Sequence, residues 1–224
     1  MGRNKPPRIK PQHPPPTPYH PPPPPVPTFD HFKLALTWPP IYCKLPTINC
    51  ANPVPFSLTI HGLWPNNINS ELKDCDPKNE IKTNWLEVLK LKGQLTTAWP
   101  SLRSHKLDDN NNFWQKEWYT HGTCSFPLFD NVEYFEVTLK LYKDIDGKKL
   151  LQKTGLLRKK SATKDEVVQA VKDHTMFMPQ IRCEKIGKYY YLLEIRFCFT
   201  ATKSPQLQHC NSSSTNCMDE DVYF

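Results

Sequence analysis

Eight cysteines constrain this chain more than any other feature of its sequence. They are Cys43, Cys50, Cys75, Cys124, Cys183, Cys198, Cys210 and Cys217. Their number is even and no two of them form a C-x-x-C pair, so neither a zinc ribbon nor a thioredoxin-like site is indicated. Four disulfide bonds in an oxidising compartment are the favoured interpretation, and eight buried thiols in a reducing one are the alternative. Eight cysteines permit roughly a hundred pairings, among which sequence alone does not choose.

The same cysteines indicate where the protein resides. Because disulfide bonds persist in oxidising compartments, we expect an extracellular protein or one of the secretory pathway or vacuole. Asn211-Ser212-Ser213 is a sequon for N-glycosylation, which agrees with this expectation. The first ten residues, MGRNKPPRIK, contain no apolar segment of the signal-peptide type and so do not add to it. No apolar run reaches about 18 residues, which argues against a transmembrane helix.

The chain divides into a proline-rich segment and a body. Residues 1–28 contain 13 of the 24 prolines and no acidic residue. Such a segment favours extended polyproline II structure, so we expect a disordered tail. The tail is either a plain spacer or a ligand for the aromatic groove of a partner that the sequence does not identify. Residues 29–224 contain all eight cysteines and all six tryptophans and are predicted to form one domain with its own core.

Net charge constrains the ligand only weakly. The formal charge is +7, of which the tail supplies four, so +3 remains for the body. That value is ordinary for a protein surface. It suits an anionic ligand without requiring one.

Three segments have the pattern of strands. Residues 32–38 alternate between apolar and polar side chains and end at two prolines. Residues 56–60 repeat this alternation and lead directly into His61 and Gly62. Residues 189–199 are rich in β-forming side chains and are predicted to be a central strand.

Helices are indicated between these strands. We predict a short helix near residues 85–93 that stops at Gly93, and a second over 113–120 after a cap at 110–112. A capping box at 163–166 predicts a helix through about residue 173. Residues 137–141 fit a helix or a strand equally well. Because strands and helices do not alternate as βαβ units, we predict an α+β fold, an antiparallel sheet flanked by helices.

Two short segments contain residues suited to catalysis. The first is LTIHGLWP, residues 58–65, in which His61 follows a predicted buried strand. The second is FWQKEWYTHGTC, residues 113–124, in which Glu117 and His121 lie four residues apart and would share one helix face. Taken singly, each histidine is more often structural, Trp64 is more often core, and a metal site from His61, Glu117 and His121 is an alternative.

Two imidazoles together are sufficient for one particular reaction. A histidine can hold or lack a proton near neutral pH, so one imidazole can act as base while the other acts as acid. RNA contains its own nucleophile, the 2′-hydroxyl beside each phosphate. An enzyme need only remove that proton, protonate the departing 5′-oxygen and stabilise charge on the phosphorus. This chemistry requires no metal and no cofactor.

The joint pattern resembles the ribonuclease T2 family. LTIHGLWP and FWQKEWYTHGTC are similar to the two active-site segments of that family, in particular to those of the plant self-incompatibility ribonucleases and their S-like relatives. TWPPIYC at 37–43, TAWPSL at 97–102 and LLEIRFCF at 192–199 extend the resemblance from about residue 29 to about residue 217.

The resemblance implies a function and a role for each residue. It implies an endoribonuclease that cleaves single-stranded RNA, but not DNA, to 2′,3′-cyclic phosphates, and that acts as a monomer away from membranes. His121 would be the general base, His61 the general acid, Glu117 the support of the phosphoryl centre, and Trp64 a stacking platform for a base. It also implies the disulfide pairs Cys43–Cys50, Cys75–Cys124, Cys183–Cys217 and Cys198–Cys210.

Two positions depart from the family pattern. Family members usually have a lysine immediately before the second histidine, where this chain has Thr120, and a hydroxyl cannot neutralise charge on the phosphorane. Loss of such a contact typically slows a reaction about 100- to 1,000-fold. Lys116 lies one helical turn before Thr120, so we hypothesise that its ammonium compensates. Asn66 stands where aspartate is frequent, and it could still hydrogen-bond a base.

These departures leave two functions open. The first is an active, metal-independent endoribonuclease that uses His61, Glu117 and His121, with Trp64, Asn66, Lys116 and Thr120 at the substrate. The second is a catalytically weakened homologue that binds, stores or recognises RNA. Only Thr120 favours the second directly.

Overall fold

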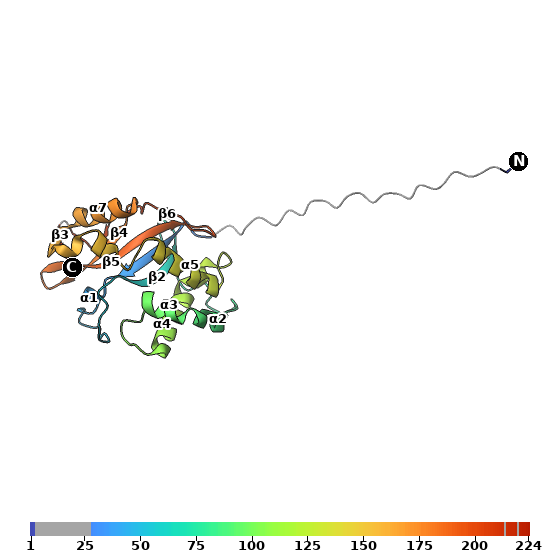
Figure 1. Ribbon diagram of the computed structural model, residues 1–224, viewed down its shortest axis with the longest axis horizontal. Coiled ribbons are helices and arrows are strands. Elements are labelled where there is room, and N and C mark those ends of the chain that lie inside the picture. The colour runs from blue at the N-terminus through green and yellow to red at the C-terminus, as the bar shows by residue number, and fades with distance from the viewer. Residues whose placement is uncertain (3–27, 213, 219) are drawn as a thin grey trace.

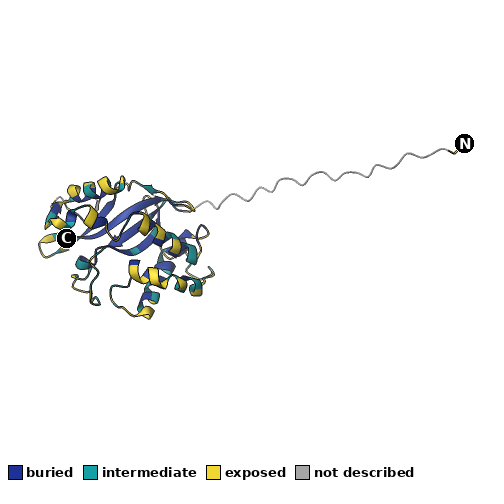
Figure 2. Ribbon diagram, in the orientation of Figure 1, coloured by how far each residue is buried: buried dark blue, intermediate teal, exposed yellow. Residues whose placement is uncertain are grey.

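The structure is a computed structural model that describes residues 1–2, 28–212, 214–218 and 220–224. The predicted tail, residues 1–28, therefore lies almost entirely outside the described residues. The body contains one hydrophobic core, to which both the sheet and the helices contribute. Figure 2 shows the sheet as the buried centre, with the exposed residues on the outward sides of the helices.

A mixed sheet forms the centre of the molecule (Figure 1). Its described strands are β1 His31–Thr37, β2 Thr59–Asn66, β3 Ser161–Thr163, β4 Gln180–Ile186, β5 Tyr189–Thr200, β6 Leu207–Gln208, β7 Ser214–Thr215 and β8 Asp221–Tyr223. The main order is β2-β1-β5-β4-β7, while β6 pairs with β5, and β8 pairs with both β3 and β5. The strands β2, β1, β5 and β4 are antiparallel neighbours, as predicted.

The predicted antiparallel pairing holds for these four strands, and the short C-terminal strands make the sheet mixed. The short strand β7 runs parallel to β4, and β8 runs parallel to β5. Both belong to the C-terminal segment, which a disulfide between Cys183 and Cys217 ties back to β4. A hairpin can connect only antiparallel strands. The disulfide bond holds these short strands close enough to pair in the parallel orientation.

The strand register divides the sheet into two chemically different faces. Residues directly opposite each other in an antiparallel pair point to the same face. On one face Phe32 lies opposite Phe199, and Leu34 lies opposite Phe197. On the other face Thr37, Ala35 and Lys33 of β1 lie opposite Glu194, Arg196 and Cys198 of β5. The second face is where charged groups gather.

Seven α-helices and two 3-10 helices are described. They are α1 Pro39–Tyr42, α2 Trp85–Lys90, α3 Lys92–Ala98, α4 Leu107–Thr120, η1 Gly122–Ser125, α5 Asn131–Asp144, α6 Leu150–Lys153, η2 Leu156–Arg158 and α7 Lys164–Thr175. In Figure 1, α2, α3 and α4 gather beneath one end of the sheet, whereas α7 and β3 lie at the opposite side. No described helix has the length and apolar character needed to cross a membrane.

Residues 137–141, which fitted a helix or a strand, are helical and belong to α5. This helix also holds the strand that contains His61 in place. It begins with a capping box between Asp130 and Glu133, a signal that the periodicity of 137–141 alone does not contain. The hydroxyl of Tyr134 donates to the carbonyl oxygen of Leu63 at 2.8 Å, and that of Tyr142 donates to Leu58 at 2.8 Å. Two buried hydrogen bonds therefore tie α5 to β2 and to the residue just before it.

Several predicted boundaries are shifted. The capping box of Thr163 and Glu166 opens α7 as predicted, and β5 spans the predicted central strand. Helix α4 begins at Leu107, so the asparagines at 110–112 lie inside it; no side chain caps it, and acidic residues fill its first turn instead. Gly93 lies in the first turn of α3 and does not stop a helix, because Leu91, the C-cap of α2, has a helical conformation from which α3 continues.

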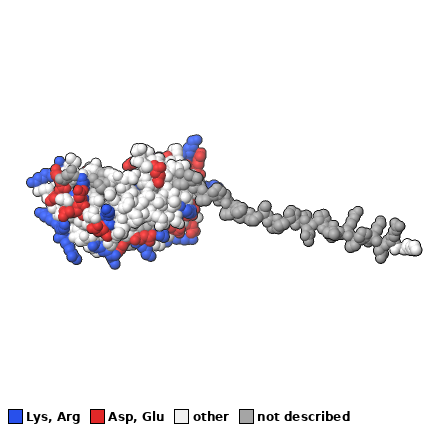
Figure 3. Space-filling view, turned by 90° about the horizontal axis from the view of Figure 1, so that it is seen from above, with Lys and Arg blue, Asp and Glu red and all other residues white. Residues whose placement is uncertain are grey.

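All eight cysteines are in disulfide bonds. The pairs are those that the resemblance implies: Cys43–Cys50, Cys75–Cys124, Cys183–Cys217 and Cys198–Cys210. Asn211 of the sequon is exposed. On the face shown in Figure 3, charged side chains of both signs are interspersed, in keeping with the small net charge of the body.

Candidate active site

The alternation of residues 56–60 predicted that His61 follows a strand. In the structure His61 lies within β2. Strand β2 continues to Asn66 because β1 pairs with it over its whole length, and it tolerates Pro65 because it is an edge strand. The register shifts between Ala35 and Leu36, which pair with Gly62 and Ile60, so His61 is the extra residue of a β-bulge. A bulge redirects a side chain out of the regular alternation.

The indole of Trp99 fixes the backbone of that bulge. Nε1 of Trp99 donates to the carbonyl oxygen of His61 at 2.8 Å. The backbone carbonyl oxygen of Trp99 accepts from Nε1 of Trp114 at 2.7 Å. Trp99 follows α3 and Trp114 belongs to α4. The backbone of His61 is thus connected through two indoles to the helix that carries Glu117.

A buried carboxylate that the sequence did not point to holds the His61 ring. Nδ1 of His61 lies 2.8 Å from Oε1 of Glu194 on β5, whose side chain is only 3% exposed. Nε and Nη2 of Arg196 lie 2.8 and 2.7 Å from the other oxygen of Glu194. Although burial disfavours a charged carboxyl, the hydrogen bond and charge of His61 and those of Arg196 lower the pKa of Glu194 to about 2.

The same contacts raise the pKa of His61. Burial pulls the pKa of His61 down, but the hydrogen bond with Glu194 and the charges of Glu194 and Glu117 outweigh it. The pKa of His61 therefore lies above its ordinary value of 6.5. Because Nδ1 is engaged by Glu194, Nε2 is the nitrogen left to face a ligand.

His121 lies where α4 ends, and its pKa is shifted in the opposite direction. It is the C-cap residue of α4, and its backbone N–H donates to the carbonyl of Glu117. Burial, followed by the positive charges of His61 and Lys73, lowers the pKa of His121 to about 4. Its Nδ1 is buried and has no hydrogen-bond partner among the described residues. His121 is thus a neutral imidazole with an unengaged ring nitrogen.

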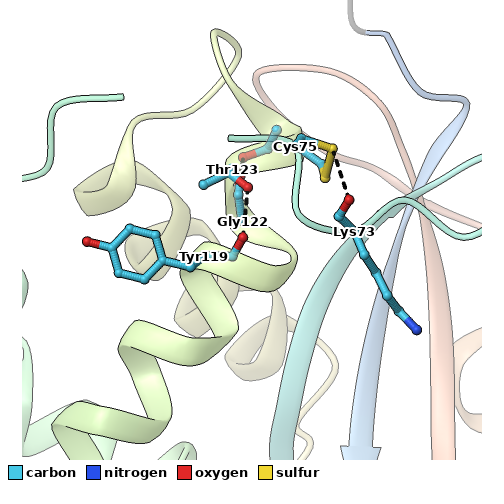
Figure 4. The surroundings of a disulfide bond; sticks show 7 residues. Lys73, Cys75, Tyr119, Gly122 and Thr123 are labelled. Carbon is cyan, nitrogen blue, oxygen red and sulfur yellow. Dashed lines mark hydrogen bonds between the residues drawn. A yellow bond between two sulfur atoms is a disulfide. The ribbon is translucent and has the colours of Figure 1, made fainter. Parts of the chain in front are cut away.

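The loop before Cys75 is clamped to this end of α4. Cys75 forms its disulfide with Cys124 of η1, and the backbone N–H of Asp74 donates to the carbonyl oxygen of Thr120 at 2.8 Å. A hydrogen bond also joins His121 to the backbone of Leu72. Figure 4 shows the disulfide between η1 and this loop, with the side chain of Lys73 extending away from the sulfur atoms.

Glu117 lies beside Trp64 and Gly62. Nε1 of Trp64 donates to Oε2 of Glu117 at 3.4 Å, and the carboxyl group is almost fully buried. Burial raises the pKa of Glu117, against the opposing charges of His61 and Lys116 and the Trp64 hydrogen bond. A side chain at Gly62 would overlap both the carboxylate and the indole, so only glycine allows this close approach.

Trp64 is the common neighbour of the catalytic candidates. Its ring centroid lies 5.1 Å from that of His61, at 79°, and 5.2 Å from that of His121, at 35°. The guanidinium of Arg196 lies 5.2 Å from the same centroid. The two histidines, predicted to approach one phosphate, are therefore packed against a single indole.

Two hollows meet at His61. The larger, about 400 Å³, is here called the Phe113 hollow and includes Tyr42, Arg103, Phe113, Lys116 and Glu117 in its lining. The smaller, about 210 Å³, is called the arginine hollow and is lined by His61, Trp64, Asn66, Glu71, Leu72, Lys73, His121, Arg182 and Arg196. Only the arginine hollow contains both imidazoles among the hollows described.

The predicted substrate residues are distributed unequally. Trp64 and Asn66 line the arginine hollow, whereas Lys116 lines the Phe113 hollow beside His61 and Glu117. Thr120 lines neither of these two hollows, and its carbonyl oxygen accepts a hydrogen bond from the backbone N–H of Asp74. Among the described residues, no three His, Cys, Asp or Glu side chains are grouped as a metal site would require.

Four further residues of the site, Glu194, Arg182, Arg196 and Lys73, were not predicted from the sequence. A local signal marks Glu194 and Arg196: these two charged residues alternate with apolar ones in a strand that is otherwise apolar. Charged residues do not lie on a sheet face that packs against an apolar core. The alternation therefore indicated that Glu194 and Arg196 lie on the other face of the sheet, in a polar cleft. No comparable signal marks Lys73.

Comparisons with known proteins show which family the chain is similar to. The Ribonuclease T2 family profile matches residues 29–217. Ribonuclease S-2 of Nicotiana alata is 31% identical over 198 residues, covering 88% of this chain and 89% of that protein. Ribonuclease S-2 of Antirrhinum hispanicum is 32% identical over 185 residues, covering 79% and 74%.

Solved structures show the same fold. Ribonuclease MC1 from bitter gourd seeds superposes with a TM-score of 0.75 at 25% identity, covering 88% of this chain and all of that one. The SF11-RNase of Nicotiana alata gives a TM-score of 0.72 at 28% identity, covering 88% and 98%. The profile match spans far more than half of the sequence, and both segments that resemble the family's active-site segments lie within it. The chain therefore belongs to the ribonuclease T2 family.

Proposed function

We propose that this protein is an active endoribonuclease that cleaves single-stranded RNA by transesterification, without a metal or another cofactor. The observation that carries the proposal is that His61 and His121 line one hollow and pack against the same indole. The pKa of His121 is lowered to about 4, and that of His61 is raised above 6.5. Between these values one ring can accept a proton while the other donates one.

The reaction follows from that arrangement. Neutral His121 accepts the proton of the ribose 2′-hydroxyl, and the 2′-oxygen forms a bond to the adjacent phosphorus. The bond from phosphorus to the 5′-oxygen breaks, and protonated His61 gives its proton to that oxygen. The products are a 2′,3′-cyclic phosphate and a free 5′-hydroxyl. DNA lacks the 2′-hydroxyl and would not be cleaved.

Neighbouring groups support each role. Glu194 orients His61 through Nδ1, so that the protonated Nε2 faces the substrate. Glu117 joins the same centre through the indole of Trp64, which donates to its carboxylate, and burial raises its pKa. A mutant of RNase MC1 in complex with 5′-UMP and RNase NT in complex with 5′-AMP are similar structures with bound nucleotides, consistent with RNA as the substrate here.

The remaining parts of the proposal concern compartment and organisation. Four disulfide bonds and the similarity to S-ribonucleases support residence in the secretory pathway or outside the cell. We propose that residues 29–224 form the ribonuclease domain and that residues 1–28 are an appendage that catalysis does not need.

A weakened homologue is the second candidate, favoured by Thr120. Digestion of RNA by the purified, oxidised protein separates the two. We expect cleavage that persists in EDTA, 2′,3′-cyclic phosphate ends, no cleavage of DNA, and a loss of roughly 100- to 10,000-fold in His61→Ala and in His121→Ala. A folded wild-type protein that leaves RNA intact at mildly acidic pH would favour the second candidate.

A further inference from the structure

The arginine hollow holds a concentration of positive charge that the family resemblance does not account for. Arg182 comes from β4, Arg196 from β5 and Lys73 from the clamped loop, and all three line the hollow together with both imidazoles. Thr120, at the position usually occupied by lysine, does not reach it. The hollow that would receive a phosphate between the histidines is thus the one with three cations from other elements.

We propose that Arg182, Arg196 and Lys73 form a phosphate site that holds the reacting RNA phosphate beside His61 and His121. This inference rests on the proposed function for the identity of the ligand, and it assigns the positive charge that Thr120 does not supply. A guanidinium presents parallel N–H donors that match two phosphate oxygens, whereas an ammonium acts as a point charge.

Arg182 is the member most available to a ligand. Its closest carboxylate contacts among the described residues are with Glu194 and Glu184, both at 3.9 Å, which is beyond hydrogen-bond distance. Its side chain is 33% exposed. A half-buried guanidinium without a close partner retains donors that can bind an anion.

Arg196 contributes in a different way. Its guanidinium is engaged by one oxygen of Glu194 and lies over the Trp64 ring, so its position is set before a ligand arrives. Arg182 lies opposite Glu194 in the register of β4 and β5, on the same sheet face as Arg196. Two guanidinium groups are therefore held on one face with a single buried carboxylate between them, and that carboxylate also serves His61.

Lys73 is brought close to His121 by the clamp. The Cys75–Cys124 disulfide and the Asp74–Thr120 hydrogen bond fasten its loop to the end of α4. Its ammonium lies 2.7 Å from Glu71, but that pair is more than half exposed. Exposed pairs contribute little, so a phosphate can compete for the ammonium. The charge of Lys73 already contributes to lowering the pKa of His121.

Binding of inorganic phosphate tests the site without any cleavage. We would titrate phosphate into the full chain by calorimetry at mildly acidic pH and low salt, and follow the ring resonances of His61 and His121 by NMR. The wild type should bind one phosphate and shift both histidines. Arg182→Ala and Lys73→Ala should each weaken binding roughly 10-fold or more, and Arg182→Lys should recover part of the loss.

Lys188→Ala is the matched control. Lys188 carries the same charge on the β4–β5 turn and lies over the ring of Tyr189, away from the hollow. Phosphate affinity unchanged in Arg182→Ala and Lys73→Ala, or reduced equally in Lys188→Ala, would overturn the inference. So would a change in base preference with phosphate affinity unaltered, because the cations would then contact bases. Thermal unfolding would first show that each variant is as stable as the wild type. If Arg182→Ala is unfolded, Arg182→Lys takes its place.

This test separates the inference from the proposed function. A wild type that cleaves RNA while its variants bind phosphate normally is a ribonuclease without this phosphate site. A wild type that leaves RNA intact but binds phosphate through these cations has the site without the activity. When both hold, Arg182→Ala and Lys73→Ala should also lower kcat/KM for RNA roughly 10-fold, and Lys188→Ala should not.

Discussion

The hydrogen bond between Glu194 and His61 is the contact on which the acid role of His61 depends. We predict that Glu194→Gln keeps the geometry but removes the charge that raises the pKa of His61. That pKa should fall, and activity should decrease about 10-fold near neutral pH but less at acidic pH, within the roughly 100- to 10,000-fold that acid–base catalysis contributes. The pH dependence of kcat/KM and NMR titration of His61 measure both effects.

The control for this change is Glu136→Gln, which removes the same charge from an exposed position of α5. It should leave the pH dependence where it is in the wild type. If Glu194→Gln instead lowered activity equally at every pH, Glu194 would act only through folding. The pKa of His61 would then depend on other groups.

At the scale of elements, the Cys75–Cys124 disulfide joins a loop to the end of α4 and positions two of the groups around the site. Its cysteines are 49 residues apart, so its removal in Cys75→Ala/Cys124→Ala should lower the free energy of unfolding by about 4 kcal/mol. Activity should also fall under conditions where the variant stays folded, because Leu72 and Lys73 would no longer be held against His121. Denaturant unfolding and RNA cleavage measure the two effects separately.

The comparison is the Cys43–Cys50 bond, which closes a separation of only 7 residues and does not join the loop to α4. Its removal should cost about 2 kcal/mol of unfolding free energy and have the smaller effect on cleavage. A Cys75→Ala/Cys124→Ala protein that is fully active while folded would mean that hydrogen bonds alone hold the loop.

The elements also show what could be predicted from the sequence. Alternation predicted β1, the content of β-forming residues predicted β5, and the four-residue spacing placed Glu117 and His121 one turn apart at the end of α4. The bulge at His61 was not predictable, because it arises from the pairing of β2 with β1, which local pattern does not encode. Glu194 and Arg182 meet His61 only through the register of neighbouring strands, and Lys73 only through a disulfide whose pairing the spacing left open.

For the whole molecule, the two histidines predict how activity depends on pH. His121 must be neutral, so activity should fall as pH drops through about 4, and His61 must be protonated, so activity should fall at a pH above 6.5. The profile of kcat/KM should therefore be a broad bell with its maximum at mildly acidic pH, and Glu194→Gln should move only its basic limb. Cleavage of a dinucleotide across this range, in the presence of EDTA, measures the profile. A maximum in alkaline solution would contradict the assignment, because His61 could no longer supply the proton that the leaving oxygen needs.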